Sequence, residues 1–185
     1  NAVGLVTTAR CSPEHLKPAE LQMSTSQDKL TSAQWIFERT LGWIAAAEIK
    51  VGAITAIDLA MLTALGAFFS AEPSKNPWAI FFGASAAGGL FIALFCTAMV
   101  LSPRLKDGPK ESLVFFGAIA SMPRADYVMR FESVSEHDIL KDIAAQIHRN
   151  AEIAQEKHEY VKKCLGWSLF AVIPWIATVG LLVKY

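Results

Sequence analysis

Asp58 is the residue whose type and position most strongly suggest a chemical role. It interrupts an otherwise uncharged apolar run from Val51 to Ala71. A carboxylate in the hydrocarbon core of a membrane is costly, and it normally faces a protein interior or water. One interpretation is a gate or polar seam between subunits. The other is a hydrogen-bonded carboxyl group that only fixes helix packing, and the sequence leaves both open.

Other chemistry-bearing residues carry weaker signals. His137, Asp138 and Asp142 stand close together and could touch a metal, but charged residues are common in a first helical turn, so we expect no metal site. The motifs H-E-x-x-H, G-x-S-x-G, G-x-G-x-x-G and the P-loop are absent from the sequence, which disfavours an enzyme. No cofactor is implied. The three cysteines are too few and too scattered for a disulfide framework.

The elements that must position Asp58 are long apolar segments. The chain has 185 residues, of which 53% are hydrophobic and 18% charged. Trp78–Leu101 and Gly166–Val183 contain no charged residue, and about 20 such residues span the hydrocarbon core. With Val51–Ala71 they predict an all-α membrane protein with three transmembrane helices; a buried core helix is the alternative for each. Lys and Arg total 17, as do Asp and Glu, so nucleic-acid binding through a basic surface is excluded.

The charged segments between the spans predict the organisation and orientation of the chain. Residues 31–71 should form a helix that starts near Thr31 or Ser32 and continues into the membrane. Residues 102–165 are rich in Lys and Arg, which places them and the N-terminus in the cytoplasm. From Ser135, an expected N-cap, one amphipathic helix should continue into the third span at residues 166–183, with Pro174 kinking its membrane half. Such a rod suits signal transmission or a simple stalk.

Two shorter segments are less defined. The run 113–119 is apolar but too short to span, and it fits a buried strand or a short helix. Residues 1–30 should be mobile or loosely packed. Residues 1–22 lack the apolar core of a signal peptide, and because the chain starts at Asn1 we expect a processed or truncated start, with Met23 a possible native one.

Small residues in the first span predict close helix packing. Gly52, Ala56, Ala60 and Ala64 recur at every fourth position, a spacing that lets helix backbones approach closely. At 100° per residue, Asp58 falls on the opposite face of the same helix. The first span therefore needs two protein-facing sides, which predicts a homo-oligomer.

The ordered set of elements resembles the Pycsar effector transmembrane family of bacterial antiphage defence. The resemblance covers roughly Trp35 to Val183, although Glu48 stands where the family commonly has Asp, and His158 where it has an aromatic residue. The segments that carry it are Ala47-Glu48-Ile49-Lys50, Phe115-Phe116-Gly117-Ala118-Ile119 and Gln146-Ile147-His148-Arg149-Asn150-Ala151-Glu152-Ile153-Ala154 with Lys157.

This resemblance implies a receptor in the bacterial inner membrane. A cyclic pyrimidine mononucleotide, cCMP or cUMP, would bind in the cytoplasm, and the spans would then impair the lipid bilayer and cause abortive infection.

A nucleotide of this kind needs a cation for its phosphate, amides for the base edge and often an aromatic stacking face. The candidate ligand-binding residues are Gln146, Arg149, Asn150 and Lys157. Phe115, Phe116 and Tyr127 are possible stacking residues. For the four candidate ligand-binding residues, the alternative interpretation is that they are solvated positions on a helix. For the aromatic pair Phe115 and Phe116, the alternative is a place in the buried core. A different function class also stays open, namely a structural or assembly membrane protein whose long helix docks a cytosolic partner.

Overall fold

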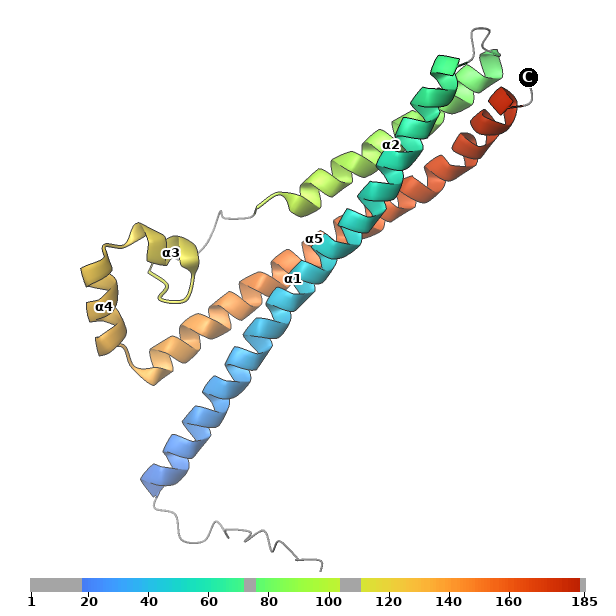
Figure 1. Cartoon of the computed structure of the whole chain (residues 1–185). Coiled ribbons are helices and arrows are strands. Elements are labelled where there is room, and N and C mark those ends of the chain that lie inside the picture. Colours follow the sequence, from blue (N-terminus) through green and yellow to red (C-terminus); the bar gives the residue numbers. More distant parts are fainter. Residues whose placement is uncertain (1–17, 72–75, 104–110, 184–185) are drawn as a thin grey trace, which may run out of the picture.

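The computed structural model describes residues 18–71, 76–103 and 111–183, with side chains described from residue 27 onward. Three long helices, α1 (Pro18–Ala71), α2 (Pro77–Leu101) and α5 (Glu136–Val183), form an elongated bundle (Figure 1). Two short helices, α3 (Phe116–Ser121) and α4 (Arg124–Ser133), lie beside one end of α5. The predicted fold class is confirmed, because all described elements are helical and the three long helices are apolar enough to span a membrane.

α1 and α5 run parallel and in contact along most of their length (Figure 1). Lys157 contacts Glu48 and Ser168 contacts Asp58, with sequence separations of 109 and 110 residues. The nearly equal separations mean that the two helices advance side by side in the same direction. We call residues 27–49 of α1 with residues 136–160 of α5 the stalk, and residues 50–71 of α1 and 161–183 of α5 together with α2 the membrane bundle.

A single seam of α1 faces α5 through both the stalk and the membrane bundle. Its positions are alternately four and three residues apart, which is the heptad spacing of a coiled coil. Every member is buried or half-buried, while most intervening residues are exposed. The seam consists of Ala33, Phe37, Thr40, Ile44, Ala47, Val51, Ile54, Asp58, Met61 and Leu65.

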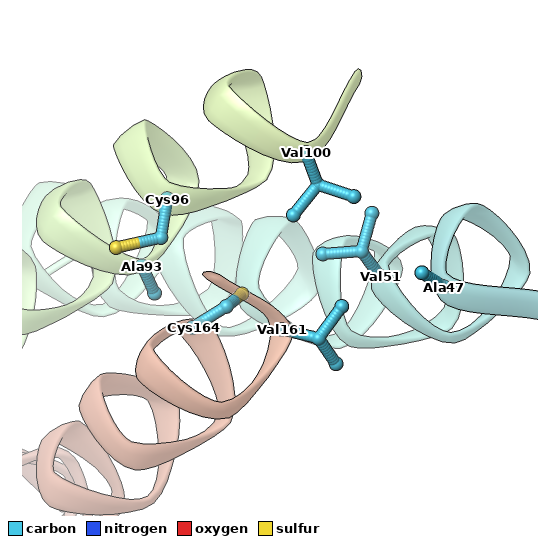
Figure 2. Close-up of a cluster of buried hydrophobic side chains, with 7 residues drawn as sticks. All are labelled: Ala47, Val51, Ala93, Cys96, Val100, Val161 and Cys164. Atoms are coloured by element: carbon cyan, nitrogen blue, oxygen red, sulfur yellow. The ribbon is translucent and has the colours of Figure 1, made fainter. Parts of the chain in front are cut away.

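α2 joins this pair where the membrane bundle begins. Figure 2 shows small and branched side chains from all three helices meeting there: Ala47, Val51, Ala93, Cys96, Val100, Val161 and Cys164. Farther along, a Cβ added at Gly89 would lie 3.0 Å from the Cβ of Ala171. Gly89 therefore lets the backbones of α2 and α5 approach closely, as small residues do in membrane proteins.

α1 starts earlier than the sequence predicts. It begins at Pro18, a residue favoured at the first helical position, rather than at Thr31 or Ser32. The two hydroxyl groups do not cap the helix. Instead, Thr31 donates to the carbonyl of Gln27 and Ser32 to that of Asp28, at 2.9 and 2.8 Å. The expected loosely packed segment 1–30 thus overlaps the helix, and its residues 1–17 lie outside the described part.

The segment before α5 resolves the strand-or-helix alternative in favour of the short helix α3. The predicted N-cap at Ser135 is confirmed, since its Oγ accepts a hydrogen bond from the Asp138 amide at 3.2 Å and donates to the Asp138 carboxylate at 2.6 Å. α5 then continues without interruption through Pro174 to Val183. The stalk and the third span are therefore one helix, as expected; whether Pro174 kinks it stays a prediction.

Candidate functional site

Asp58 lies at the centre of the membrane bundle. Its side chain is fully buried, and its Oδ2 accepts a 2.9 Å hydrogen bond from Ser168 Oγ of α5. Oδ1 has no hydrogen-bond partner among the described residues. A buried carboxyl oxygen without a hydrogen-bond partner is costly in an apolar medium.

Hydroxyl and thiol groups beside Asp58 connect all three helices. Thr55 Oγ1 of α1 and Thr97 Oγ1 of α2 share a hydrogen bond at 3.0 Å, and Thr97 Oγ1 is 3.4 Å from Cys164 Sγ of α5. Ser168 Oγ also donates to the Cys164 carbonyl at 3.0 Å. Asp58 therefore belongs to a polar cluster inside the membrane bundle, with one oxygen that the cluster does not satisfy.

The small-residue stripe of α1 faces away from this cluster, as the helical wheel predicts. Gly52, Ala56 and Ala60 are exposed and Ala64 is half-buried. A Cβ added at Gly52 would meet no described atom within 4 Å. The stripe does not pack within the described part of the chain, so its predicted role in helix packing now requires a second chain and stays a prediction.

The structure separates the four predicted ligand residues. Lys157 is 4% exposed and its Nζ lies 2.5 Å from Glu48 Oε1, so its charge serves the contact between α1 and α5. Gln146 is also 4% exposed, and its Nε2 has no partner within the described part of the chain. Lys157 faces α1 through its contact with Glu48.

Arg149 and Asn150 lie on the flanks of the same helix face and are half-buried. Arg149 Nη1 contacts Glu152 Oε2 at 3.2 Å. The structure therefore does not gather the four side chains around one open space, and their role in ligand binding stays a prediction.

Asp142 anchors the turn before α3 to the stalk. Its Oδ1 and Oδ2 accept hydrogen bonds from Ser112 Oγ at 2.8 and 2.9 Å, and its Oδ2 accepts one from the Leu113 amide at 2.8 Å. Ser112 Oγ in turn accepts from the Phe115 amide at 2.8 Å. Asp142 and Asp138, considered above as metal ligands, thus have structural roles here as anchor and cap.

The aromatic residues of this region are arranged in two pairs. The rings of Phe115 and Phe116 lie 5.0 Å apart between centroids, and Phe116 is 63% exposed. Tyr127 stacks on Phe131 of α4 at 5.9 Å. At least Phe116 is therefore not a core residue, in contrast to the buried-core interpretation of the sequence.

A second open surface lies on the outer side of α1 and was missed by sequence reasoning. Trp35, Glu38, Arg39, Gly42 and Trp43 line a hollow of about 480 Å³. The Arg39 guanidinium lies 5.9 Å from the centroid of the Trp35 ring. The signal was present in the sequence, because Trp, Arg and Trp follow one another at every fourth position and hence share one face of a helix.

Comparison with protein families matches residues 32–184 to the Pycsar effector protein domain. No curated protein and no solved structure matches the chain. The match covers most of the chain, including the stalk from residue 32, the membrane bundle and both short helices.

Proposed function

Because the chain belongs to the Pycsar effector family and is thus an effector of antiphage defence, we propose that it senses a cyclic pyrimidine mononucleotide, cCMP or cUMP, and then impairs the bacterial inner membrane. Binding would occur on the cytoplasmic side during phage infection. The membrane would lose its potential, and the infected cell would stop growing before the phage matures.

The continuity of α5 is the observation that carries this proposal. One helix connects Asp142, which holds the turn before α3, with Ser168, which holds Asp58 in the membrane bundle. A rigid helix transmits a shift or rotation at one end to the other, because its intrahelical hydrogen bonds resist local deformation. Ligand binding at the stalk can therefore change the polar cluster.

The proposed orientation rests on the charges that flank the spans. In the sequence, Arg104 and Lys106 follow the second span and Lys162 and Lys163 precede the third, whereas the link between α1 and α2 carries Lys75 as its sole Lys or Arg. Lys and Arg accumulate on the cytoplasmic side of bacterial membrane proteins. The stalk and the N-terminus would then be cytoplasmic.

The proposed lesion involves Asp58 and a second copy of the chain. The outward stripe from Gly52 to Ala64 is suited to close helix contact between subunits. In the active oligomer, a movement of α5 would open a seam at which the unsatisfied Oδ1 of Asp58 meets water. Asp58 would be the gate of this seam.

A direct test uses the purified chain in vesicles of anionic lipid with a potential-sensitive dye. We expect cCMP or cUMP to dissipate an imposed potential, while the non-cyclic nucleotide CMP leaves it unchanged. Vesicles that hold their potential at saturating concentrations of both cyclic nucleotides would contradict the proposal.

An assembly protein is the second candidate, and the surface of α4 favours it. Val128, Met129 and Phe131 are 44%, 63% and 53% exposed, which suits the docking of a cytosolic partner. If this function is correct, replacing these residues with Ser should remove partner binding, and cyclic nucleotides should not change the thermal stability of the chain.

A further inference from the structure

The hollow on α1 presents the groups that a cyclic pyrimidine nucleotide requires. Trp35 and Trp43 are 63% and 48% exposed, so a base can reach both indole rings, and the Arg39 guanidinium lies 5.9 Å from the centroid of the Trp35 ring. Arg39, one helical turn from each, carries a guanidinium that pairs with phosphate. We infer that this hollow is the nucleotide site, an inference that rests on the proposed function and names the residues that perform its sensing step.

The shape of the hollow depends on Gly42. Four other side chains, those of Trp35, Glu38, Arg39 and Trp43, surround it, and a Cβ added at Gly42 would meet no described atom within 4 Å. Because Gly42 has no side chain, it leaves the space between the tryptophan and the charged side chains open. The hollow has a volume of about 480 Å³ and is open to solvent, because all five residues that line it belong to one face of α1.

Packing within the described part of the chain does not account for these exposed aromatics. The seam of α1 that contacts α5 contains Ala33, Phe37 and Thr40, and every residue lining the hollow lies off that seam. Two tryptophans and an arginine on an outward face are the residue types enriched at binding sites.

The hollow also lies too far from the bilayer for a lipid-anchoring belt. Lys50 is the last charged residue before the first span, and Arg39 precedes it by about 16 Å along the helix. The headgroup layer is about 5–8 Å thick on each side. Arg39 therefore stands in water, where a soluble anion can reach it.

The cations on α5 are less suited to this ligand. Lys157 is buried in its pair with Glu48, and Arg149 contacts Glu152. A phosphate would have to displace Glu48 from Lys157, and it would share the Arg149 guanidinium with Glu152.

Glu38 indicates which pyrimidine the site prefers. A carboxylate opposite position 3 of the base would accept a hydrogen bond from the N3–H of uracil. With Glu38 opposite position 4 instead, its carboxylate accepts a hydrogen bond from the N4 amino group of cytosine but meets the O4 acceptor of uracil. We therefore expect cCMP to bind at least about tenfold more tightly than cUMP, since a hydrogen bond to a charged group is worth about that ratio. Glu38→Gln supplies both a donor and an acceptor and should bring the two affinities within about threefold of each other.

The experiment measures cCMP and cUMP affinity by calorimetry with the full chain in zwitterionic detergent. We expect Arg39→Gln, Trp35→Leu and Gly42→Leu each to weaken cCMP binding at least about tenfold. Three matched controls should remain within about twofold of the parent. Lys29→Gln removes a cation from the same helix, Trp78→Leu removes a tryptophan with the same 63% exposure, and Gly66→Leu fills an equally open glycine position.

The outcomes separate this inference from the proposed function. If the parent binds cCMP but Arg39→Gln and Gly42→Leu bind it equally well, the α1 site is wrong while nucleotide sensing stands. If only Arg149→Ala loses cCMP binding, the α1 site is likewise wrong and the nucleotide site lies on α5. A parent that binds neither nucleotide would refute both proposals. If binding of phosphatidylglycerol to the chain requires Arg39 while binding of cCMP does not, the hollow is a lipid site and the inference is overturned.

Discussion

Replacing Asp58 with asparagine removes a carboxylate from the interior of the membrane bundle while keeping the size of the side chain. The amide oxygen of the introduced asparagine can still accept the 2.9 Å hydrogen bond that Ser168 donates to Oδ2 in the parent. We expect this variant to insert, assemble and bind nucleotide like the parent, because those steps depend on packing and on the stalk. Membrane depolarisation should fall, because the seam loses the charged group that attracts water.

The same reasoning predicts how Asp58→Leu changes the stability of the assembled protein. It removes the Ser168 hydrogen bond, and such bonds between membrane helices contribute about 0.6 kcal/mol on average and at most about 1.7. It also removes Oδ1, the buried oxygen without a partner in the described structure. The variant should therefore assemble at least as well as the parent, and it should be inactive.

The assay combines unfolding in mixed detergent micelles with dye depolarisation in vesicles. A double-mutant cycle of Asp58→Leu with Ser168→Ala should give a coupling free energy near about 0.6 kcal/mol, which isolates the hydrogen bond from effects on packing. The reasoning is refuted if Asp58→Asn and Asp58→Leu both depolarise vesicles to the extent of the parent, since Asp58 would then be a packing residue alone.

Three further predictions concern other contacts. Glu48→Ala should destabilise the chain by about 1–3 kcal/mol because it leaves the buried Lys157 ammonium without its carboxylate, and adding Lys157→Met should recover most of that loss in a chemical denaturation series. Gly89→Leu should cost about 1–3 kcal/mol by forcing α2 away from α5, whereas Gly88→Leu, which meets no described atom, should be neutral by the same measurement. Asp142→Ala should speed amide hydrogen exchange in the turn before α3 without changing exchange in the membrane bundle, and unchanged protection of that turn would argue against its role as an anchor.

The spans and the long helix could be predicted because hydrophobic length and helical periodicity are local properties. Trp78–Leu101 is uncharged over its whole length, and the structure has α2 over nearly the same residues. The same is true of the Ser135 cap, whose partner is three residues away. The all-helical fold class, the number of spans and the helix face on which Asp58 lies all followed from hydrophobic length and residue spacing.

Contacts between distant segments were not predictable in this way. Lys157 looks like a solvated cation or a ligand residue until its partner Glu48, 109 residues earlier, is known. Gln146 was misleading in a similar way, because its burial to 4% exposure arises only when segments distant in the sequence pack against α5. The apolar segments dominate the sequence pattern and do not point to a site at Trp35 and Arg39. The four-residue spacing of these two residues nevertheless places them on one helix face.

The parallel pairing of α1 and α5 has a consequence for how this architecture can change in length. Because the contacts between the two helices follow a nearly constant offset, which is 109 residues at Lys157, 110 at Ser168 and 114 at the long side chain of Trp175, an insertion in one helix alone would shift every contact beyond it. Seven residues added to both helices at the same level would restore each seam position to its face. The distance between the sensing surface and the bilayer would then grow by about 10.5 Å for each such step. Natural variants of the architecture should accordingly differ in stalk length by matched multiples of seven.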